Sequence, residues 1–300
     1  MAAIPRVLLL GSEGQLGREL KQTLAKPFEL LTSSRNQGDH PCDLSDLDQV
    51  ADLLRKVQPD HIVNAAAYTA VDQAESERDQ AFLLNRDLPK LLAEHMADRS
   101  GLLTHYSTDY VFSGTGNRPY RENDPTDPVN TYGESKLAGE KAVEDTGCQH
   151  LIFRTAWVYG RHGKNFVKTI VRLAAERESL SVVDDQLGRP TCAADLAELS
   201  SAALAQSLGN STSGIFHLSA NGDPVSWYGF AKAFLSWKQT QQPGVALAEP
   251  SPVPSTEFPT PARRPSYSVL SNQLFEERFG LAVPTWQDQL NKALPSFTWN

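Results

Sequence analysis

The sequence has few cysteines, and they are not arranged for a disulfide scaffold or a zinc module. Only three occur in 300 residues, Cys42, Cys148 and Cys192, and they stand far apart with no Cys-x-x-Cys pair or matching histidine spacing. Such usage fits a reducing compartment. Long apolar runs are lacking as well: no stretch approaches the roughly 18 to 20 apolar residues of a membrane span, and the apolar run near the N-terminus is too short for a signal peptide. We therefore expect a cytoplasmic protein with no membrane partner.

Positive charge is also scarce. Lys and Arg number 28 against 36 Asp and Glu, which gives a formal net charge of -8. A chain that acidic is not built to wrap a polyanion, so nucleic acid is excluded as a partner class, although a few local cations suffice for a small anion. The length of 300 residues predicts one large or two medium domains.

What the first half does contain is a regular alternation of short apolar runs and longer helical patterns. Strands are expected at residues 7–10, 28–32, 61–65, 101–107 and 150–155. Helices are expected in a segment ending near residue 24 and at residues 44–57, 79–97 and 132–145. Pro89 falls inside the third helix and predicts a kink or a break there. The alternation predicts an α/β fold with a doubly wound parallel, Rossmann-like sheet covered on both faces.

The pattern changes after about residue 160. The remaining elements are expected as a helix at 165–176, a strand at 180–184, a turn at 188–191, a helix at 193–207 and a strand at 214–219. Seven prolines between Pro243 and Pro265 exclude a regular helix or a central strand and predict an ordered wrapping loop or a flexible flap. We expect one domain over residues 1–160 and a smaller C-terminal domain over 161–300, with some later segments returning to the first.

A glycine-bearing segment, Gly11-Ser-Glu-Gly14-Gln-Leu-Gly17, follows the first expected strand and opens the first expected helix. Glycines at this place allow a tight turn and a close approach by a pyrophosphate, which the positive end of the helix attracts. A plain structural turn is the competing interpretation. The strand-turn-helix context favours dinucleotide binding by the first domain.

The end of the second strand bears on the choice of cofactor. An NAD-preferring site usually has an acidic residue there for the ribose 2′-hydroxyl, whereas this sequence has Arg35 and no acid. A guanidinium matches the geometry of a 2′-phosphate, which favours NADPH and leaves NADH open, while the competing interpretation is a solvated surface arginine. Asp43 and Leu44 either approach the adenine or simply cap the next helix.

The second signal is the pair Tyr132 and Lys136, four residues apart at the start of an expected helix. That spacing places both side chains on one face. A lysine ammonium beside a phenol favours the phenolate, so we expect Tyr132 to exchange a proton near neutral pH. The alternative is that Tyr132 and Lys136 lie on the exposed surface of the helix and have no catalytic role.

Polar side chains follow two of the expected strands. Ser107 and Thr108 end the fourth strand with hydroxyl groups that could polarise a substrate carbonyl, although such clusters also form turns and caps. Asn64 is followed by Ala65, Ala66, Ala67 and Tyr68, small residues that either let a nucleotide lie flat or allow tight helix packing. His105 is expected to be a hydrogen-bonded core residue rather than a catalyst.

Together these blocks carry a family resemblance. The glycine trio, the segment from Asn64 to Asp72, the block from Ser107 to Phe112 and the Tyr132/Lys136 pair resemble the extended short-chain dehydrogenase/reductases. Within them the chain is most similar to the dTDP-4-dehydrorhamnose reductase family. Agreement continues at residues 153–160, 185–191 and 259–265, and it covers the chain to about residue 290.

The resemblance implies an activity and a set of site residues. The activity is NAD(P)H-dependent reduction of the C4 keto group of dTDP-4-dehydro-6-deoxy-L-mannose to dTDP-L-rhamnose, for rhamnose-containing cell-surface polysaccharide, with residues 161–300 as mainly the substrate-binding domain. The implied catalytic residues are Thr108, Tyr132 and Lys136. The implied or expected cofactor-binding residues are Gly11, Gly14, Gln15, Leu16, Gly17, Arg35, Asp43, Leu44, Ala65, Ala66, Ala67, Tyr68, Thr69, Tyr106, Tyr132 and Lys136. The implied residues for the dTDP-sugar are Val71, Ser107, Thr108, Tyr110, Trp157, Asn165 and Arg264.

Two of these assignments have alternatives, and one departs from the family. Trp157 could be a core aromatic, and Arg263 could replace Arg264. Some family members hold a magnesium ion through glutamates at a dimer contact, where this chain carries Ala193, Ala194 and Asp195. This departure makes a magnesium requirement and that dimer mode doubtful, so no metal site is predicted and a homodimer is left open.

Two other function classes share much of the pattern. One is a cofactor-binding regulatory subunit of the methionine adenosyltransferase type, which the intact Thr108, Tyr132 and Lys136 argue against without excluding. The other is a different nucleotide-sugar epimerase, dehydratase or reductase. Dehydratases usually carry further carboxylates after the Ser/Thr position, and here Asp109 is present without a second acid.

Overall fold

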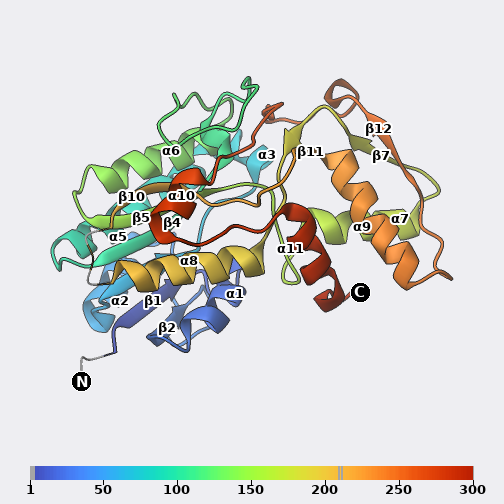
Figure 1. Ribbon diagram of the computed structural model, residues 1–300. Coiled ribbons are helices and arrows are strands. Elements are labelled where there is room, and N and C mark those ends of the chain that lie inside the picture. Colours follow the sequence, from blue (N-terminus) through green and yellow to red (C-terminus); the bar gives the residue numbers. More distant parts are fainter. Residues whose placement is uncertain (1–3, 209, 211, 300) are drawn as a thin grey trace.

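A six-stranded parallel sheet forms the core of the larger of two lobes (Figure 1). The computed structural model describes residues 4–208, 210 and 212–299. The strand order is β10-β5-β4-β3-β1-β2. The bounds of these strands are β1 Arg6–Leu10, β2 Glu29–Ser33, β3 His61–Asn64, β4 Leu102–Thr108, β5 Gln149–Thr155 and β10 Gly214–His217. The chain enters the sheet at β1, adds β2 at the edge beside it and then crosses to β3 on the other side of β1, which confirms the predicted doubly wound α/β fold.

Helices cover both faces of this sheet, because successive residues of each strand point to opposite sides. On one face, Val7 and Leu9 of β1 pack in a cluster with Leu20 of α1 and Leu196 of α8. On the other face, Leu8 and Leu10 belong to a cluster formed with α2, α5 and α6. The bounds of these helices are α1 Gln15–Leu24, α2 Leu47–Val57, α5 Leu88–Ala97, α6 Thr131–Glu144 and α8 Ala193–Ser207. Within the described ranges no helix is both long and apolar enough to cross a membrane.

The long helix expected at 79–97 is interrupted, as Pro89 predicted. Helix α4, Arg78–Phe82, runs into a π-helical segment, η1, Leu83–Asp87, and α5 then begins with Pro89 in its first turn. A proline is tolerated in the first turn because its missing N–H has no partner inside the helix there. The helix expected from residue 44 begins later, at Leu47, because the Asp46 side chain caps it by accepting a hydrogen bond from the Gln49 N–H.

A second, smaller lobe is built around its own apolar cluster. Phe230 and Phe234 of α9 pack there with Val167 of α7 and Trp286 of α11. The elements of this lobe and its edges are β6 Val158–Tyr159, α7 Phe166–Glu176, β7 Leu180–Val183, β8 Leu187–Gly188, β9 Thr191–Cys192, β11 Val225–Ser226, α9 Trp227–Gln241, β12 Pro250–Val253, η3 Ser255–Glu257, α11 Trp286–Ala293 and η4 Leu294–Ser296. The domain boundary near residue 160 stays a prediction. Strand β10 pairs with β5, and Phe275 and Phe279 of α10, Gln273–Phe279, pack in the cluster that covers one face of the sheet.

Two expectations for this region have different outcomes. The turn expected at 188–191 is wrong: Gly188 ends β8 and Thr191 begins β9, and Arg189 and Pro190 join the two strands without a turn. The residue before a proline favours an extended over a helical conformation, which agrees with this arrangement. The proline-rich segment between Pro243 and Pro265 takes the first of the two expected forms, an ordered wrapping loop. Its strand β12 pairs in parallel with β7 in a sheet of two strands, where proline is tolerated at an edge.

Candidate active site

A cavity of about 640 Å³ opens where the carboxyl ends of the central strands meet the second lobe. Parallel sheets place their ligands at this edge. The glycine turn after β1, the ends of β4 and β5, helix α6 and the second lobe all contribute to its wall. The lining residues are Gly11, Gly14, Gln15, Leu16, Ala65, Ala66, Ala67, Thr69, Val71, Tyr106, Ser107, Thr108, Asp109, Tyr110, Tyr132, Lys136, Thr155, Ala156, Trp157, Val158, Gly163, Lys164, Asn165 and Trp227.

The glycine turn is shaped for close approach. Gly11 has a φ of +75°, and a Cβ there would lie 2.8 Å from the Ala66 nitrogen. Gly17 lies on the opposite side of the turn, where a Cβ would come 2.0 Å from the Gly11 carbonyl oxygen. A side chain on Gly11 would therefore push the turn away from the segment after β3, and one on Gly17 would push helix α1 away from the turn.

The start of α1 fits an anionic group. Gly14 is its N-cap and has no side chain that could cap the helix. Among the described residues, the first turn of α1 carries no acidic side chain either. The first N–H groups of a helix have no partner inside the helix, and the helix dipole attracts negative charge to this end. A nucleotide diphosphate is such an anion, so the residues present fit a dinucleotide cofactor.

Two hydroxyl groups in the cavity have unused hydrogen-bonding capacity. Ser107 Oγ and Thr155 Oγ1 are buried, and neither has a hydrogen-bond partner among the described residues. A buried polar atom without a partner is costly and is usually explained by a ligand or water. The two hydroxyls indicate that a polar ligand completes the site.

Helix α6 fixes Tyr132 and Lys136 at its first turns. Asn130 caps the helix by accepting a hydrogen bond of 2.8 Å from the Gly133 N–H, and the Thr131 N–H donates to Glu75. Lys136 is 1% exposed, and its Nζ donates to the Tyr106 carbonyl oxygen at 2.6 Å. Both predicted residues therefore line one cavity, as their spacing predicted.

The proton affinity of Tyr132 differs from the sequence-based expectation. Burial raises the pKa of Tyr132 to about 12, although the nearby Thr108 hydroxyl acts to lower it. We expected Lys136 to lower that pKa, but its Nζ is directed to the Tyr106 carbonyl oxygen. The phenol therefore carries its proton at neutral pH and is in the form that a proton donor needs.

Thr108 lies between two further groups at the end of β4. Its hydroxyl donates to Asp109 Oδ1 at 3.0 Å and accepts from the Tyr110 N–H at 3.2 Å. Asp109 also lines the cavity, and burial raises the pKa of its carboxyl to about 7, although the hydroxyls of Ser268 and Thr108 stabilise the charged form. The Asp109 side chain was not among the predicted site residues, and its place directly after Thr108 was the signal for it.

Five of the predicted cofactor residues do not line the cavity. These are Gly17, Arg35, Asp43, Leu44 and Tyr68. Arg35 and Asp43 form a solvent-exposed ion pair of 3.5 Å, whereas Leu44 is buried in the apolar cluster on one face of the sheet. The Tyr68 hydroxyl donates to Glu77 at 2.7 Å.

Of the predicted substrate residues, all but one line the cavity. The exception is Arg264, whose guanidinium forms an ion pair of 2.9 Å with Asp72. Both charges influence the phenol of Tyr110, so the pair lies next to that cavity residue. Arg263 faces the same region through its carbonyl oxygen, which accepts a hydrogen bond from Asn130.

Trp157 and Asn165 line the cavity and are also held by protein contacts. The indole of Trp157 stacks on that of Trp227. Asn165 caps α7, and its Nδ2 donates to Gln15 Oε1 at 2.9 Å, which joins the second lobe to the start of α1.

Sequence reasoning missed several lining residues. Trp227 reaches the cavity from the first turn of α9, about seventy residues after Trp157 in the chain, and no motif marked it. Lys164 adds a cation, and its position directly before Asn165 could have indicated it. The remaining missed residues are Thr155, Ala156, Val158 and Gly163.

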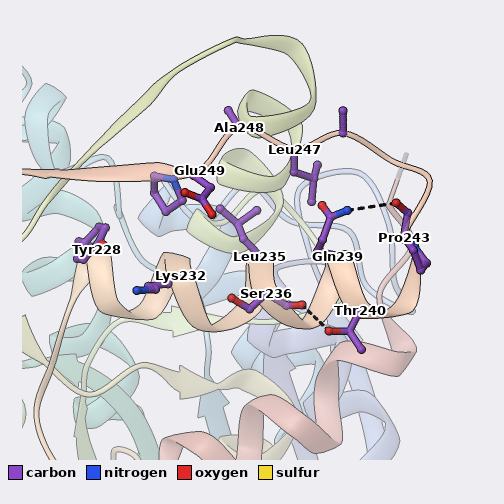
Figure 2. A pocket seen from close by; sticks show the side chains of 12 residues that line it. Tyr228, Lys232, Leu235, Ser236, Gln239, Thr240, Pro243, Leu247, Ala248 and Glu249 are labelled. Atoms are coloured by element: carbon purple, nitrogen blue, oxygen red, sulfur yellow. Dashed lines mark hydrogen bonds between the residues drawn. The ribbon is translucent and has the colours of Figure 1, made fainter.

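A larger cavity of about 790 Å³ lies between α9 and the segment that follows it (Figure 2). It shares no lining residue with the cavity around Tyr132. Its polar side chains are partly engaged already, since Thr240 donates to the Ser236 carbonyl oxygen and Gln239 to that of Pro243. The smaller cavity is therefore the candidate active site. Among the described residues there is no group of three or more His, Cys, Asp or Glu side chains that could hold a metal ion.

Known proteins with similar sequences span the same length as this chain. The family described as RmlD substrate binding domain matches residues 5–298. The chain is 44% identical to a dTDP-4-dehydrorhamnose reductase of Burkholderia thailandensis, over 94% of this chain and 95% of the relative. It is 43% identical to a dTDP-4-dehydrorhamnose reductase of Escherichia coli strain K12, over 96% of each chain.

Solved structures of similar proteins agree with these sequence comparisons. A dTDP-4-dehydrorhamnose reductase from Bacillus anthracis in complex with NADP matches with a TM-score of 0.88 and 34% identity, over 98% of this chain and 100% of that one. A related structure from Clostridium acetobutylicum matches with a TM-score of 0.87 and 34% identity, over 97% of this chain and 99% of that one.

Proposed function

This chain belongs to the dTDP-4-dehydrorhamnose reductase family, and on that premise we propose that Thr108, Tyr132 and Lys136 carry out its reaction. The reaction is the reduction of the C4 keto group of dTDP-4-dehydro-6-deoxy-L-mannose to dTDP-L-rhamnose, and NADPH is the cofactor, with NADH as a second option. The family predicted from the sequence motifs is thereby confirmed. The product would serve rhamnose-containing cell-surface polysaccharide.

The cofactor would be held by the first domain. NADPH supplies the hydride for the C4 carbon when it is bound. Gly11, Gly14 and the first N–H groups of α1 would receive its diphosphate, and Lys136 would bind the nicotinamide ribose. Arg35, which lies beside Asp43, would meet the 2′-phosphate.

Tyr132 is the proton donor in this proposal. Its phenol is protonated at neutral pH, because burial raises its pKa to about 12. An alkoxide forming at C4 is a stronger base than a phenolate, so the Tyr132 hydroxyl gives its proton to that oxygen as the charge develops. The Thr108 hydroxyl accepts from the Tyr110 N–H and, once its proton has turned from Asp109, would hold the C4 oxygen beside the phenol.

The rest of the cavity would bind the nucleotide-sugar. The unpartnered hydroxyls of Ser107 and Thr155 suit sugar hydroxyls, and Trp157 offers an aromatic edge. Val71, Tyr110 and Asn165 would complete the contact. Arg264 stays a candidate for the diphosphate, and binding would require its guanidinium to leave Asp72.

Two further proposals concern the protein in the cell. We propose that it acts in the cytoplasm and that it does not require magnesium, and we leave open whether it forms a homodimer. Light scattering on the purified chain, with and without a chelator, tests the assembly and its independence from metal.

The observation that carries the assignment is the convergence of Tyr132, Lys136 and Thr108 on one cavity with the glycine turn. The test follows NADPH oxidation by its near-ultraviolet absorbance, with dTDP-4-dehydro-6-deoxy-L-mannose generated freshly in the assay. We expect substrate-dependent oxidation that Tyr132→Phe abolishes while NADPH binding, seen by fluorescence, is retained. Binding without turnover by the unmodified enzyme would favour another keto-sugar or a regulatory subunit, and near-normal kcat in Tyr132→Phe would remove the role of the phenol.

A further inference from the structure

Lys136 contacts a buried histidine that has no part in the proposed reaction. His105 lies on β4 and is fully buried. Its Nε2 is 3.2 Å from Lys136 Nζ, and its Nδ1 is 3.2 Å from Asn64 Nδ2. Asn64 and His105 are direct neighbours in the register of β3 and β4, so the sheet itself holds the two side chains together. One continuous hydrogen-bond network therefore joins Asn64, His105 and Lys136.

The direction of the first hydrogen bond follows from the backbone. The Ala66 N–H donates to Asn64 Oδ1 at 3.1 Å. That contact leaves the Nδ2 amino group of Asn64 facing His105, and an amide nitrogen can only donate. Nδ1 of His105 must therefore accept. In a neutral imidazole the proton then sits on Nε2, the nitrogen that faces Lys136.

The second hydrogen bond has a consequence for the charge of Lys136. An Nε2–H can donate to Nζ only if the amine has a free lone pair, and an ammonium has none. A neutral amine satisfies every partner: it accepts from His105 and donates one of its two N–H groups to the Tyr106 carbonyl oxygen. A charged Lys136 would set two donors against each other in a buried place, which is costly.

The surroundings of Lys136 agree with this arrangement. Burial lowers the pKa of Lys136 to about 8, and the pKa of His105 is held well below its usual value by burial and by Lys136. The charged group facing Lys136 from its own helix is Glu140, which favours the ammonium. That carboxylate is engaged by Arg154 from β5 at 2.7 and 2.9 Å. From the end of β4, Asp109 faces the phenol of Tyr132.

We propose that His105 is a positioning residue of the reductase, which donates its Nε2 proton to Lys136 and so favours the uncharged form of that amine. The proposal rests on the assignment of Lys136 to the reaction. In the proposed reaction Lys136 would hold the nicotinamide ribose, and its ammonium would stabilise the phenolate that Tyr132 becomes after giving up its proton, so loss of the Lys136 proton would end activity at high pH. The direction of the hydrogen bonds from Asn64 would then set the pH at which kcat/KM begins to decrease, which is its alkaline limb.

The decisive variant is Asn64→Asp, which reverses the donor-to-acceptor direction of the hydrogen bonds from residue 64 through His105 to Lys136. A carboxylate at this position still accepts from the Ala66 N–H, and it presents an acceptor to Nδ1 in place of a donor. His105 would then carry its proton on Nδ1, and Nε2 would accept from a charged Lys136. We expect the alkaline limb of kcat/KM to move up by about one pH unit or more.

Two controls separate the hydrogen-bond direction from simple charge. Nitrogen NMR of histidine-labelled protein reports the tautomer without any turnover, and His105→Gln identifies the His105 signals by their loss. We expect the Nε2–H tautomer in the unmodified enzyme and the Nδ1–H tautomer in Asn64→Asp. Relative to His105→Phe, which lacks the imidazole, the double variant Asn64→Asp/His105→Phe carries only the new charge, and its shift of the limb should be less than half of the shift that Asn64→Asp causes in the unmodified enzyme.

The outcomes are distinct. An Nδ1–H tautomer in the unmodified enzyme overturns the proposal, and so does an unmoved alkaline limb in a folded Asn64→Asp protein that binds NADPH. If Asn64→Asp does not fold, His105→Phe replaces it: the phenyl ring has no N–H to donate to Lys136, so the alkaline limb should again rise, and an unmoved limb overturns the proposal. If the His105 tautomer is as expected but Tyr132→Phe keeps its turnover, the proposed function fails. The direction of the hydrogen bonds from Asn64 through His105 to Lys136 is then still supported.

Discussion

The indole rings of Trp157 and Trp227 are stacked with their centroids 3.5 Å apart and their planes within 5° of each other. Trp157 belongs to the segment after β5 and Trp227 to the first turn of α9, so the stack joins the sheet to the second lobe across the cavity. Trp157 also has a φ of +48°, which is uncommon for a bulky residue. The second indole supports the first in that conformation.

Loss of the second indole should affect the sugar substrate more than the cofactor. We expect Trp227→Ala to raise KM for the nucleotide-sugar roughly tenfold, since an aromatic stack contributes about 0.5–1.5 kcal/mol beyond its buried area. Initial rates at varied substrate give KM, and fluorescence gives the Kd for NADPH, which should change by less than about twofold. Trp237→Ala is the matched control, because Trp237 lies on the same helix and contacts Trp299 instead. Equal effects of the two variants would contradict the prediction.

The buried ion pair between Arg154 and Glu140 should be needed for stability. Both side chains are at most 4% exposed, and the guanidinium binds the carboxylate through two hydrogen bonds. Arg154→Met leaves a buried carboxylate unpaired, and we expect a loss of about 3–5 kcal/mol in the free energy of unfolding. Urea unfolding measures it. The double variant Arg154→Met/Glu140→Leu should recover part of the loss, and a double variant that is less stable than the single one would show that the pair itself stabilises the fold.

Asp109 should make stability depend on pH. Its folded-state pKa is raised to about 7 from an ordinary value of 3.8, because the carboxyl is buried. A raised pKa means that the stability due to this group is fully present below about pH 4 and is lost as the pH rises through 7. Asp109→Asn keeps the acceptor for Thr108 but does not titrate. The unmodified protein should therefore lose a few kcal/mol relative to this variant between pH 4 and 8, with about 4 kcal/mol as the upper bound.

Unfolding by urea at several pH values measures this difference directly. Asp195→Asn is a suitable control, since Asp195 is a buried carboxyl on α8 that is paired with Lys292 and lies outside the cavity. Parallel stability curves for the unmodified protein and Asp109→Asn would show that the Asp109 carboxyl titrates in its ordinary range.

Arg35 should influence the choice between NADPH and NADH. Its guanidinium is largely exposed and pairs with Asp43 at 3.5 Å. If it binds the 2′-phosphate, Arg35→Ala should raise KM for NADPH roughly tenfold and leave KM for NADH unchanged. Arg55→Ala is the matched control, because Arg55 is an exposed arginine of α2 paired with Asp52. A similar change for both cofactors would assign Arg35 to the solvated surface.

The parts of the site that follow local rules could be predicted from the sequence. Tyr132 and Lys136 share a helix face because four residues make about one turn, and Gly11 and Gly14 open a helix directly after a strand. The parallel sheet followed from the alternation of apolar runs and helical patterns.

The parts that depend on distant contacts could not be predicted. Trp227 meets Trp157 through packing between segments about seventy residues apart, and no local spacing encodes that. The direction of the Tyr132 pKa shift was wrong because burial, which dominates it, is a property of the folded surroundings. The contact of Lys136 with His105 depends on which face of β4 meets α6, and that in turn depends on the register of the sheet.

The place of β10 beside β5 has a consequence for synthesis of the chain. Phe216 of β10 and Phe275 of α10 pack against Phe153 of β5, so the sheet gains its last strand and part of its cover from residues made late. Until then, a nascent chain emerging from the ribosome has an unpaired β5 edge and exposed aromatic side chains, both of which invite association with other chains. The half that holds the glycine turn is thus finished only after the residues of α10 have been translated.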